Sequence, residues 1–185
     1  ANSYTFTAVA VNHTIASSFN GGWSAPSGST NVIVITNPNN VFTSNNTYTR
    51  YWGLGEGADY INFNIPTIPA GSIINGIEVA VEGNSSGGMN MQVQLSGNNG
   101  TTFTTVTSAR ITNLLASDST VILGGAGDTW GKAWSNTEFT NANFRVRMLS
   151  APPATDRKDI DQIQVKVTYT LPVTAPTVTT QPVTA

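Results

Sequence analysis

Apolar and polar residues alternate one by one near the C-terminal end of the chain. Over residues 161–170 the apolar positions are Ile163, Val165, Val167 and Tyr169, and the residues between them are Gln162, Gln164, Lys166 and Thr168. A period of two residues places all the apolar side chains on one face of an extended chain. This stretch therefore predicts a long strand with one buried face and one face in water.

The same alternation predicts several more strands. Residues 143–149 place Phe144, Val146 and Met148 on the buried face and Arg145 and Arg147 on the other, and Ser72–Glu82 buries Ile77, Val79 and Val81. Further strands are expected at Tyr4–Val11, Met89–Leu95, Ala109–Leu115 and Ser119–Leu123. Half-buried strands of this kind are typical of antiparallel sheets packed face to face.

One apolar run lacks the alternation. Asn31–Thr36 reads N-V-I-V-I-T and is followed by the turn residues Asn37 and Pro38. A short β-branched run bounded by turn residues predicts a strand that is buried on both faces.

The clearest turn signal is Asn99-Gly100 within Ser96–Val106, because a two-residue hairpin turn needs positive φ at both central positions. The spacing of Ser96, Asn98, Gly100, Thr102 and Phe103 is similar to the Asp-box hairpin, with Asn and Phe in place of its Asp and Trp. We interpret this segment as structural.

Long amphipathic helices are missing from the pattern, and only Ser135–Ala142 predicts a helical turn, capped by Thr137 with Glu138 in its first turn. The expected fold is all-β: one antiparallel β-sandwich over residues 1–170, jelly-roll-like, with about eight to ten strands and very little helix. Residues 171–185 hold three prolines among Thr and Val, and predict an extended linker or inter-subunit tail.

Composition narrows the function. Charged residues make up 10% of the 185 residues, the net charge is -2 and there is no cysteine. Without a Lys/Arg cluster or an apolar run of membrane length, we expect neither nucleic-acid binding nor membrane insertion. The nearly uncharged Ser/Thr/Asn surface favours an extracellular, cell-surface or virion-surface location.

The residues for catalysis are few. His13 is the single histidine, and the acids are scattered, so we predict no enzyme activity and no catalytic residue. Asp156, Asp159 and Asp161 offer the hard oxygen ligands that calcium prefers. The interleaved Arg157 and Lys158 favour ion pairing instead, which leaves structural calcium as an alternative and predicts no other metal or cofactor.

Aromatic residues supply the candidate binding site. Trp23, Tyr51 and Trp52 lie in loops rich in glycine and polar residues, where flat rings can stack on sugars. Trp130 and Trp134 are interpreted as core residues, because large rings more often fill a core than bind a ligand.

Three blocks in order carry a family resemblance: N-F-N-I-P-T-I-P-A-G-S-I-I-N-G-I-E-V-A-V at residues 62–81, D-T-W-G-K-A-W-S-N-T-E-F-T-N-A-N-F-R-V-R-M at 128–148 and I-D-Q-I-Q-V-K-V-T-Y-T at 160–170. Together, over Asn37–Thr170, the chain resembles a β-sandwich module that recurs in long bacterial surface proteins and in virion or fibre proteins. The closing block is also similar to the last strand of jelly-roll carbohydrate-binding modules. The resemblance implies a secreted, multidomain, structural or adhesive context.

Two functions follow as predictions. The first is a structural subunit or domain of an extracellular filament, stalk or fibre, whose partners are copies of itself or neighbouring domains. Such subunits assemble when a terminal segment adds as a strand to a neighbouring sheet, and the donor here would be Tyr4–Val11 or the tail Val173–Val183. The alternative is a carbohydrate-binding module that uses Trp23, Tyr51 and Trp52 to hold a glycan.

Overall fold

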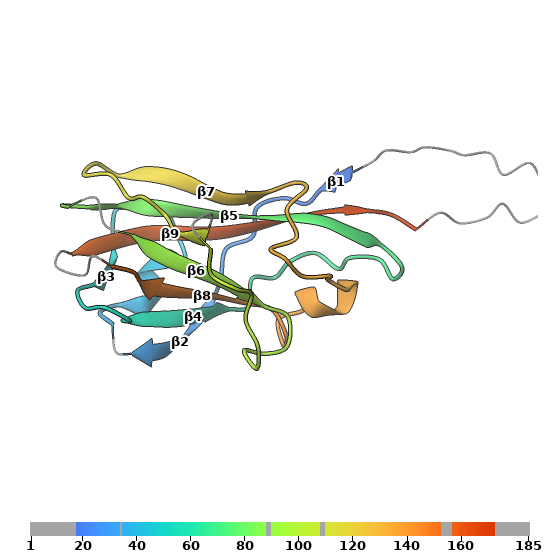
Figure 1. Ribbon diagram of the computed structural model, residues 1–185, viewed down its shortest axis with the longest axis horizontal. Helices are drawn as coiled ribbons and strands as arrows, with labels where there is room; N and C mark the ends of the chain where they lie inside the picture. The colour runs from blue at the N-terminus through green and yellow to red at the C-terminus, as the bar shows by residue number, and fades with distance from the viewer. Residues whose placement is uncertain (1–17, 34, 88–89, 108–109, 153–156, 173–185) are drawn as a thin grey trace, which may run out of the picture.

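Two antiparallel sheets packed face to face make up the protein, and the computed structural model describes residues 18–33, 35–87, 90–107, 110–152 and 157–172. Sheet A has the order β1 (Ser18–Asn20), β9 (Lys158–Thr170), β5 (Ile73–Ser85) and β7 (Ser119–Gly125), and β3 (Thr49–Tyr51) also pairs with β9. Sheet B has the order β2 (Gly28–Ile33), β4 (Gly57–Ile61), β8 (Arg145–Ser150) and β6 (Met91–Ser96). Figure 1 shows β5, β7 and β9 in one layer and β2, β4, β6 and β8 in the other. These nine strands in the described ranges confirm the predicted all-β sandwich.

Strand β9 organises sheet A. β5 pairs with it from Ile73 to Ser85 on one side. The opposite side is taken in succession by β1, by single bridges from Ser24 and Phe42, and by β3. The long alternating strand therefore holds segments from both halves of the chain in place.

The core lies between the sheets and contains the alternating residues that the sequence placed inside. Fully buried side chains come from β5 (Ile77, Val79, Val81), β8 (Val146, Met148), β6 (Val93, Leu95) and β9 (Ile163, Val165). Trp130 and Trp134 are also buried, as predicted, and their indole N–H groups donate to the carbonyls of Ile77 and Thr129. At one end of the sandwich, four rings from Phe63, Trp134, Phe139 and Phe144 form an aromatic cluster.

The prediction of a strand buried on both faces at Asn31–Thr36 is wrong. β2 ends at Ile33, and Val32 and Ile33 are 42% and 50% exposed, whereas Ile35 beyond the strand is buried. An apolar run has the same appearance at a sheet edge as in a core, because periodicity does not report which neighbours a strand has.

The predicted strand Ala109–Leu115 is also wrong where the structure describes it. After a single bridge from Ile111 to Gln92, residues 112–115 are irregular. The backbone N–H of Thr112 donates to the Met91 carbonyl, and the backbone N–H of Thr104 donates to the Leu95 carbonyl. Residues 104 and 112 therefore cover the outer edge of β6.

The helical turn and the hairpin turn lie where they were expected. The turn η3 (Asn136–Phe139) is capped by Ser135, not by Thr137, and Glu138 completes the capping box. Asn99 and Gly100 have φ of 58° and 80°, and Ser96 Oγ accepts the Gly100 N–H at 2.9 Å. Only one arm of the hairpin is a strand, since residues 103–107 have no regular structure. A second short turn among the described residues is η1 (Pro38–Val41).

Some expectations fall outside the described residues, namely the strand Tyr4–Val11, His13 and the tail from Val173. The division into a sandwich over 1–170 and a linker over 171–185 stays a prediction. Among the helices within the described ranges, none has the length and apolar character that crossing a membrane requires.

The ion pair between the buried Arg110 and Asp128 should make the stability of the fold depend on pH. Arg110 lies 4.1 Å above the Trp130 ring, and its Nη2 donates to Asp128 Oδ1 at 2.6 Å. This hydrogen bond holds the pKa of Asp128 below its usual value despite partial burial. A lowered folded-state pKa adds stability above the unfolded-state pKa and loses it as the pH falls through the folded-state value.

We therefore expect Asp128→Asn to lower the free energy of unfolding by up to about 1 kcal/mol at neutral pH, because solvent screens this partly exposed ion pair. The difference from the unaltered protein should shrink as the pH falls below the ordinary aspartate pKa of about 4, because the unfolded state takes up a proton first and the folded state follows at lower pH. Urea unfolding at a series of pH values measures it, and an undiminished difference in acid would contradict the ion-pair account.

Candidate functional site

The three aromatic residues predicted to form one binding platform do not lie together. Tyr51 is fully buried in the core, and its hydroxyl lies 2.6 Å from the Tyr60 hydroxyl. Burial raises the pKa of the Tyr51 phenol well above its usual value, and the neighbouring Tyr60 adds to the effect. Tyr51 has no surface to offer a ligand, so its assignment to the site is corrected: the last residue of β3 faces the core.

Trp23 and Trp52 are both on the surface, but far apart. Trp23 lies beside Lys166, with Nζ 4.8 Å from its ring centroid, and Trp52 lies beside Arg157, 5.8 Å away. Lys166 and Arg157 are separated by nine positions along the same extended segment, which corresponds to about 30 Å. The two tryptophans therefore belong to different surfaces.

Trp23 stands on the outer face of sheet A. Its neighbour Ser24 is paired with Val165, whose side chain points into the core, so the next position on each chain, Trp23 and Lys166, points outward. The indole is 38% exposed. The ring therefore presents part of its surface to solvent at one end of a wide sheet face.

Polar side chains continue from Trp23 along this face. Cross-strand partners on β5 and β9 are Glu78 with Lys166, Ala80 with Gln164 and Glu82 with Gln162. Glu78 and Lys166 form an ion pair at 2.7 Å. We call the set Trp23, Glu78, Glu82, Gln162, Gln164 and Lys166 the outer row.

The two glutamines of the outer row keep their hydrogen-bonding capacity. They line a shallow hollow over the small side chain of Ala80, together with Glu82 and Thr120. Neither amide has a side-chain hydrogen bond to another described residue. A primary amide has two donor hydrogens and an acceptor oxygen, so these groups are available to a ligand that lies on the face.

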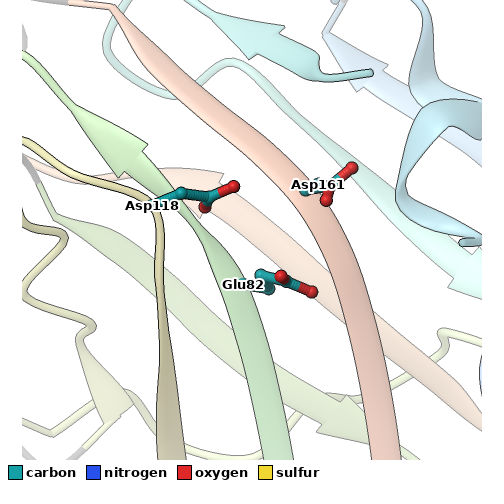
Figure 2. Close-up of side chains that lie close together, drawn as sticks. All are labelled: Glu82, Asp118 and Asp161. Carbon is teal, nitrogen blue, oxygen red and sulfur yellow. The ribbon is translucent and has the colours of Figure 1, made fainter. Parts of the chain in front are cut away.

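The outer row ends at a group of acids. The carboxylate oxygens of Glu82, Asp118 and Asp161 come within 4.8 Å of one another, and the side chains extend from β5, from the residue before β7 and from β9 (Figure 2). Asp161 is the additional residue of a bulge in β9, because Glu82 pairs with Gln162 and Gly83 with Ile160. The bulge places Asp161 beside Gln162 on the outer face.

This acidic group is held by the protein itself. Asp161 is buried and accepts the backbone N–H groups of Asn45 and Asn46 at 3.1 Å. Asp118 is exposed and accepts the Tyr48 hydroxyl at 3.1 Å, and partial burial together with this contact raises the pKa of Tyr48. Carboxylates suit calcium, but the group by itself does not define a metal site.

The calcium alternative from the sequence placed Asp161 with different residues. Asp156 is outside the described residues, and Asp159 pairs with Arg157 at 2.7 Å and with Arg50 at 3.4 Å. Ion pairing of Asp159, which the interleaved Arg157 favoured, is thus confirmed. Lys158 is buried and donates to Ser150 Oγ at 2.6 Å.

A second hollow lies at the end of the sandwich between residues 64–68 and η3. This open cleft of about 600 Å³ is lined by three asparagines, Asn64, Asn136 and Asn141, with Thr137 and Thr140 at its rim. Asn64 and Asn141 bind each other twice, at 2.8 and 2.9 Å, and Asn136 donates to the Ile68 carbonyl. Because these amides already bind within the cleft and its one aromatic ring, Phe139, is buried, the outer row is the better binding surface.

Comparisons with known proteins found similar folds at low similarity. No protein-family model and no curated protein matches the sequence. Among solved structures, the chain is similar to the CBM36-1 domain of a multidomain xylanase from the hindgut metagenome of Trinervitermes trinervoides, with 12% identity, 80% of this chain and 96% of that chain covered, and a TM-score of 0.43.

Two further structures are more distant. The CBM22-1 xylan-binding domain of Xyn10C from Paenibacillus barcinonensis has 11% identity, covers 79% of this chain and 85% of its own, and has a TM-score of 0.34. A chain of the cyanophage Pam1 capsid asymmetric unit has 16% identity and a TM-score of 0.34, and the match covers 91% of this chain and 98% of the capsid chain. The neighbours include carbohydrate-binding modules, yet similarity at this level carries no argument about ligand or partner. Recurrence in surface proteins stays a prediction.

Proposed function

We propose that this protein is a non-catalytic, extracellular carbohydrate-binding module that holds a polysaccharide chain along the outer row of sheet A. The observation that carries the proposal is the exposed Trp23 on the same sheet face as Gln162 and Gln164, whose amides have no side-chain partner among the described residues. Sugar binding needs both kinds of group, because pyranose rings combine an apolar C–H face with a rim of hydroxyls.

Trp23 has the role of the stacking residue. Lys166 lies near the ring at 4.8 Å from its centroid and is itself paired with Glu78. The cation–π contact favours this orientation of the indole, which reduces the conformational entropy lost when a sugar packs on the exposed part of the ring.

The shape and charge of the face favour a neutral polymer. The outer row follows strand β9, and the distance from Lys166 to Gln162 along it corresponds to about 13 Å, enough for a few sugar units. Because Lys166 and Glu78 neutralise each other, only Glu82 leaves a net charge in the row. A flat, extended polysaccharide such as a β-1,4-linked glucan or xylan fits this strip better than a chain end or an acidic glycan.

The test is affinity electrophoresis of the full chain in gels that contain xylan, β-glucan, hydroxyethylcellulose or galactomannan. At least one neutral polymer should retard the unaltered protein, and Trp23→Ala should weaken binding about tenfold or more. Trp52→Ala is the matched control, because Trp52 is also an exposed tryptophan, 56% accessible, on a different surface.

Gln164→Ala should weaken binding to a smaller degree, since it removes hydrogen bonds and leaves the stacking surface. If no polymer retards the unaltered protein, or if Trp52→Ala and not Trp23→Ala abolishes the shift, the proposal is wrong. Circular dichroism of each variant distinguishes loss of binding from loss of folding.

A further inference from the structure

A second aromatic ring stands at the acidic end of the outer row. Tyr48 comes directly before β3, in which Thr49 and Tyr51 face the core and Arg50 faces solvent. The alternation of an extended chain therefore directs the Tyr48 side chain outward, onto the same face as the outer row. Its hydroxyl donates to Asp118 Oδ2 at 3.1 Å, in agreement with this direction.

Trp23 and Tyr48 lie along the same side of β9. The bridge from residue 24 and the strand β3 both pair with the side of β9 that β5 leaves free. Opposite the two aromatic residues, β9 has Lys166 and Asp161, which are about 15 Å apart along the strand. The glutamines of the outer row lie between these positions, so the two rings stand at the two ends of the glutamine pair.

The Tyr48 ring leans over the sheet. Asp118 precedes β7, and both β9 and β5 lie between β3 and β7. Because neighbouring strands are about 4.8 Å apart, roughly 14 Å separates the main chain at Tyr48 from that at Asp118. Both side chains must therefore extend across the sheet to form their hydrogen bond. Tyr48 is partly exposed, so a ring in this position presents a face to solvent.

Contacts at its two ends hold this residue in place. Asn40 Nδ2 donates to the Tyr48 carbonyl at 3.0 Å, and the hydroxyl at the other end is bound to Asp118. Within the described ranges, no other aromatic ring and no cation stacks on the Tyr48 ring. A held aromatic ring with an open face suits the apolar C–H face of a pyranose.

We propose that Tyr48 is the second stacking residue of the glycan site, which then binds a segment of neutral polysaccharide long enough to reach from Trp23 to Tyr48. This inference rests on the proposed function. The carboxylates beside Tyr48 accept hydrogen bonds from sugar hydroxyls and repel the carboxylates of an acidic glycan. A short oligosaccharide reaches only one ring, so affinity should rise with chain length until both rings are covered.

The test is calorimetric titration of the full chain with cello-, xylo- and manno-oligosaccharides, from the disaccharide to the hexasaccharide. The hexasaccharide that binds the unaltered protein best should bind Tyr48→Ala about tenfold more weakly. Tyr48→Phe is the matched control, because it keeps the ring and loses only the hydrogen bond to Asp118. Its affinity should differ from that of the unaltered protein by no more than about threefold.

The disaccharide distinguishes stacking on Tyr48 from a structural role. Its binding, followed through the indole N–H signal of Trp23, should be equal in Tyr48→Ala and in the unaltered protein. The inference is overturned if Tyr48→Ala binds the hexasaccharide normally, or if it weakens disaccharide binding to the same degree.

Failure of this inference can be told apart from failure of the proposed function. If Trp23→Ala weakens hexasaccharide binding and Tyr48→Ala does not, the glycan site on the outer row stands and the role of Tyr48 is wrong. If no oligosaccharide binds the unaltered protein, both are wrong.

Discussion

Replacing Phe144 with alanine should lower the free energy of unfolding by about 4 kcal/mol, the largest effect expected of a single truncation in this protein. The side chain is 1% exposed and stands at the centre of the aromatic cluster. Its ring centroid is 5.3 Å from that of Phe139, 5.7 Å from Phe63 and 6.2 Å from Trp134. Alanine would remove all three ring contacts and leave a cavity among the remaining rings.

Phe144→Leu is the graded control for this change. Leucine keeps most of the buried volume and loses only the aromatic contacts, so its cost should be about 1–2 kcal/mol. Urea unfolding followed by tryptophan fluorescence measures both variants. Equal costs for alanine and leucine would mean that ring geometry, and not filled volume, stabilises this end of the sandwich.

Gly83→Ala should lower the free energy of unfolding by about 3 kcal/mol. Gly83 lies on β5 opposite the bulge of β9, where a methyl group would collide with the Asp159 carbonyl oxygen and lie 3.0 Å from Ile160 Cα. Both neighbours are backbone atoms of a central strand, so they cannot move aside as a side chain would. The bulge also positions Asp161, and the change should disturb the acidic end of the outer row.

Gly127→Ala is the matched control, because nothing lies within 4 Å of the added methyl group at that position. Its effect should be within about 0.5 kcal/mol. Thermal unfolding of both variants compares them directly. A Gly83→Ala protein as stable as Gly127→Ala would show that the bulge in β9 adapts, contrary to its description as a fixed feature.

The sequence predicted the strands that are long and half-buried. β5, β8 and β9 show a strict alternation because one face packs on the opposite sheet and the other meets water, and each inward residue expected there is buried. The alternation of β9 also placed Gln162, Gln164 and Lys166 on the polar face. It could not identify Glu78 and Glu82 as their partners, because pairing between distant strands leaves no trace in a single sequence.

The short elements were harder to predict. The run Val32–Ile35 contains two exposed residues at a sheet edge and a buried one beyond it, and all three are equally apolar. Ser135 caps η3 in place of Thr137 because the turn begins two residues earlier than its composition indicated. In both cases the local sequence permits more than one arrangement, and contacts with distant parts of the chain determine which one forms.

The surface position of the candidate aromatic residues was predicted for two of the three, and their role in binding stays a prediction. A polar, glycine-rich context indicated that Trp23, Tyr51 and Trp52 lie near the surface, and two of the three do. Tyr51 differs because β3 alternates: Thr49 and Tyr51 face inward and Arg50 faces solvent. A period of two over only three residues is too short to be recognised in a sequence, so the buried ring could not be separated from its exposed neighbour Trp52.

The most direct measurement is the NMR signal of the indole N–H groups during titration with the neutral oligosaccharide that binds best. The chain has four tryptophans, and two of them, Trp130 and Trp134, are buried with their N–H groups bonded to backbone carbonyls. Glycan binding on the outer row predicts a large shift for Trp23 and none for Trp52. A shift confined to Trp52, or no indole shift while the oligosaccharide binds, would contradict it.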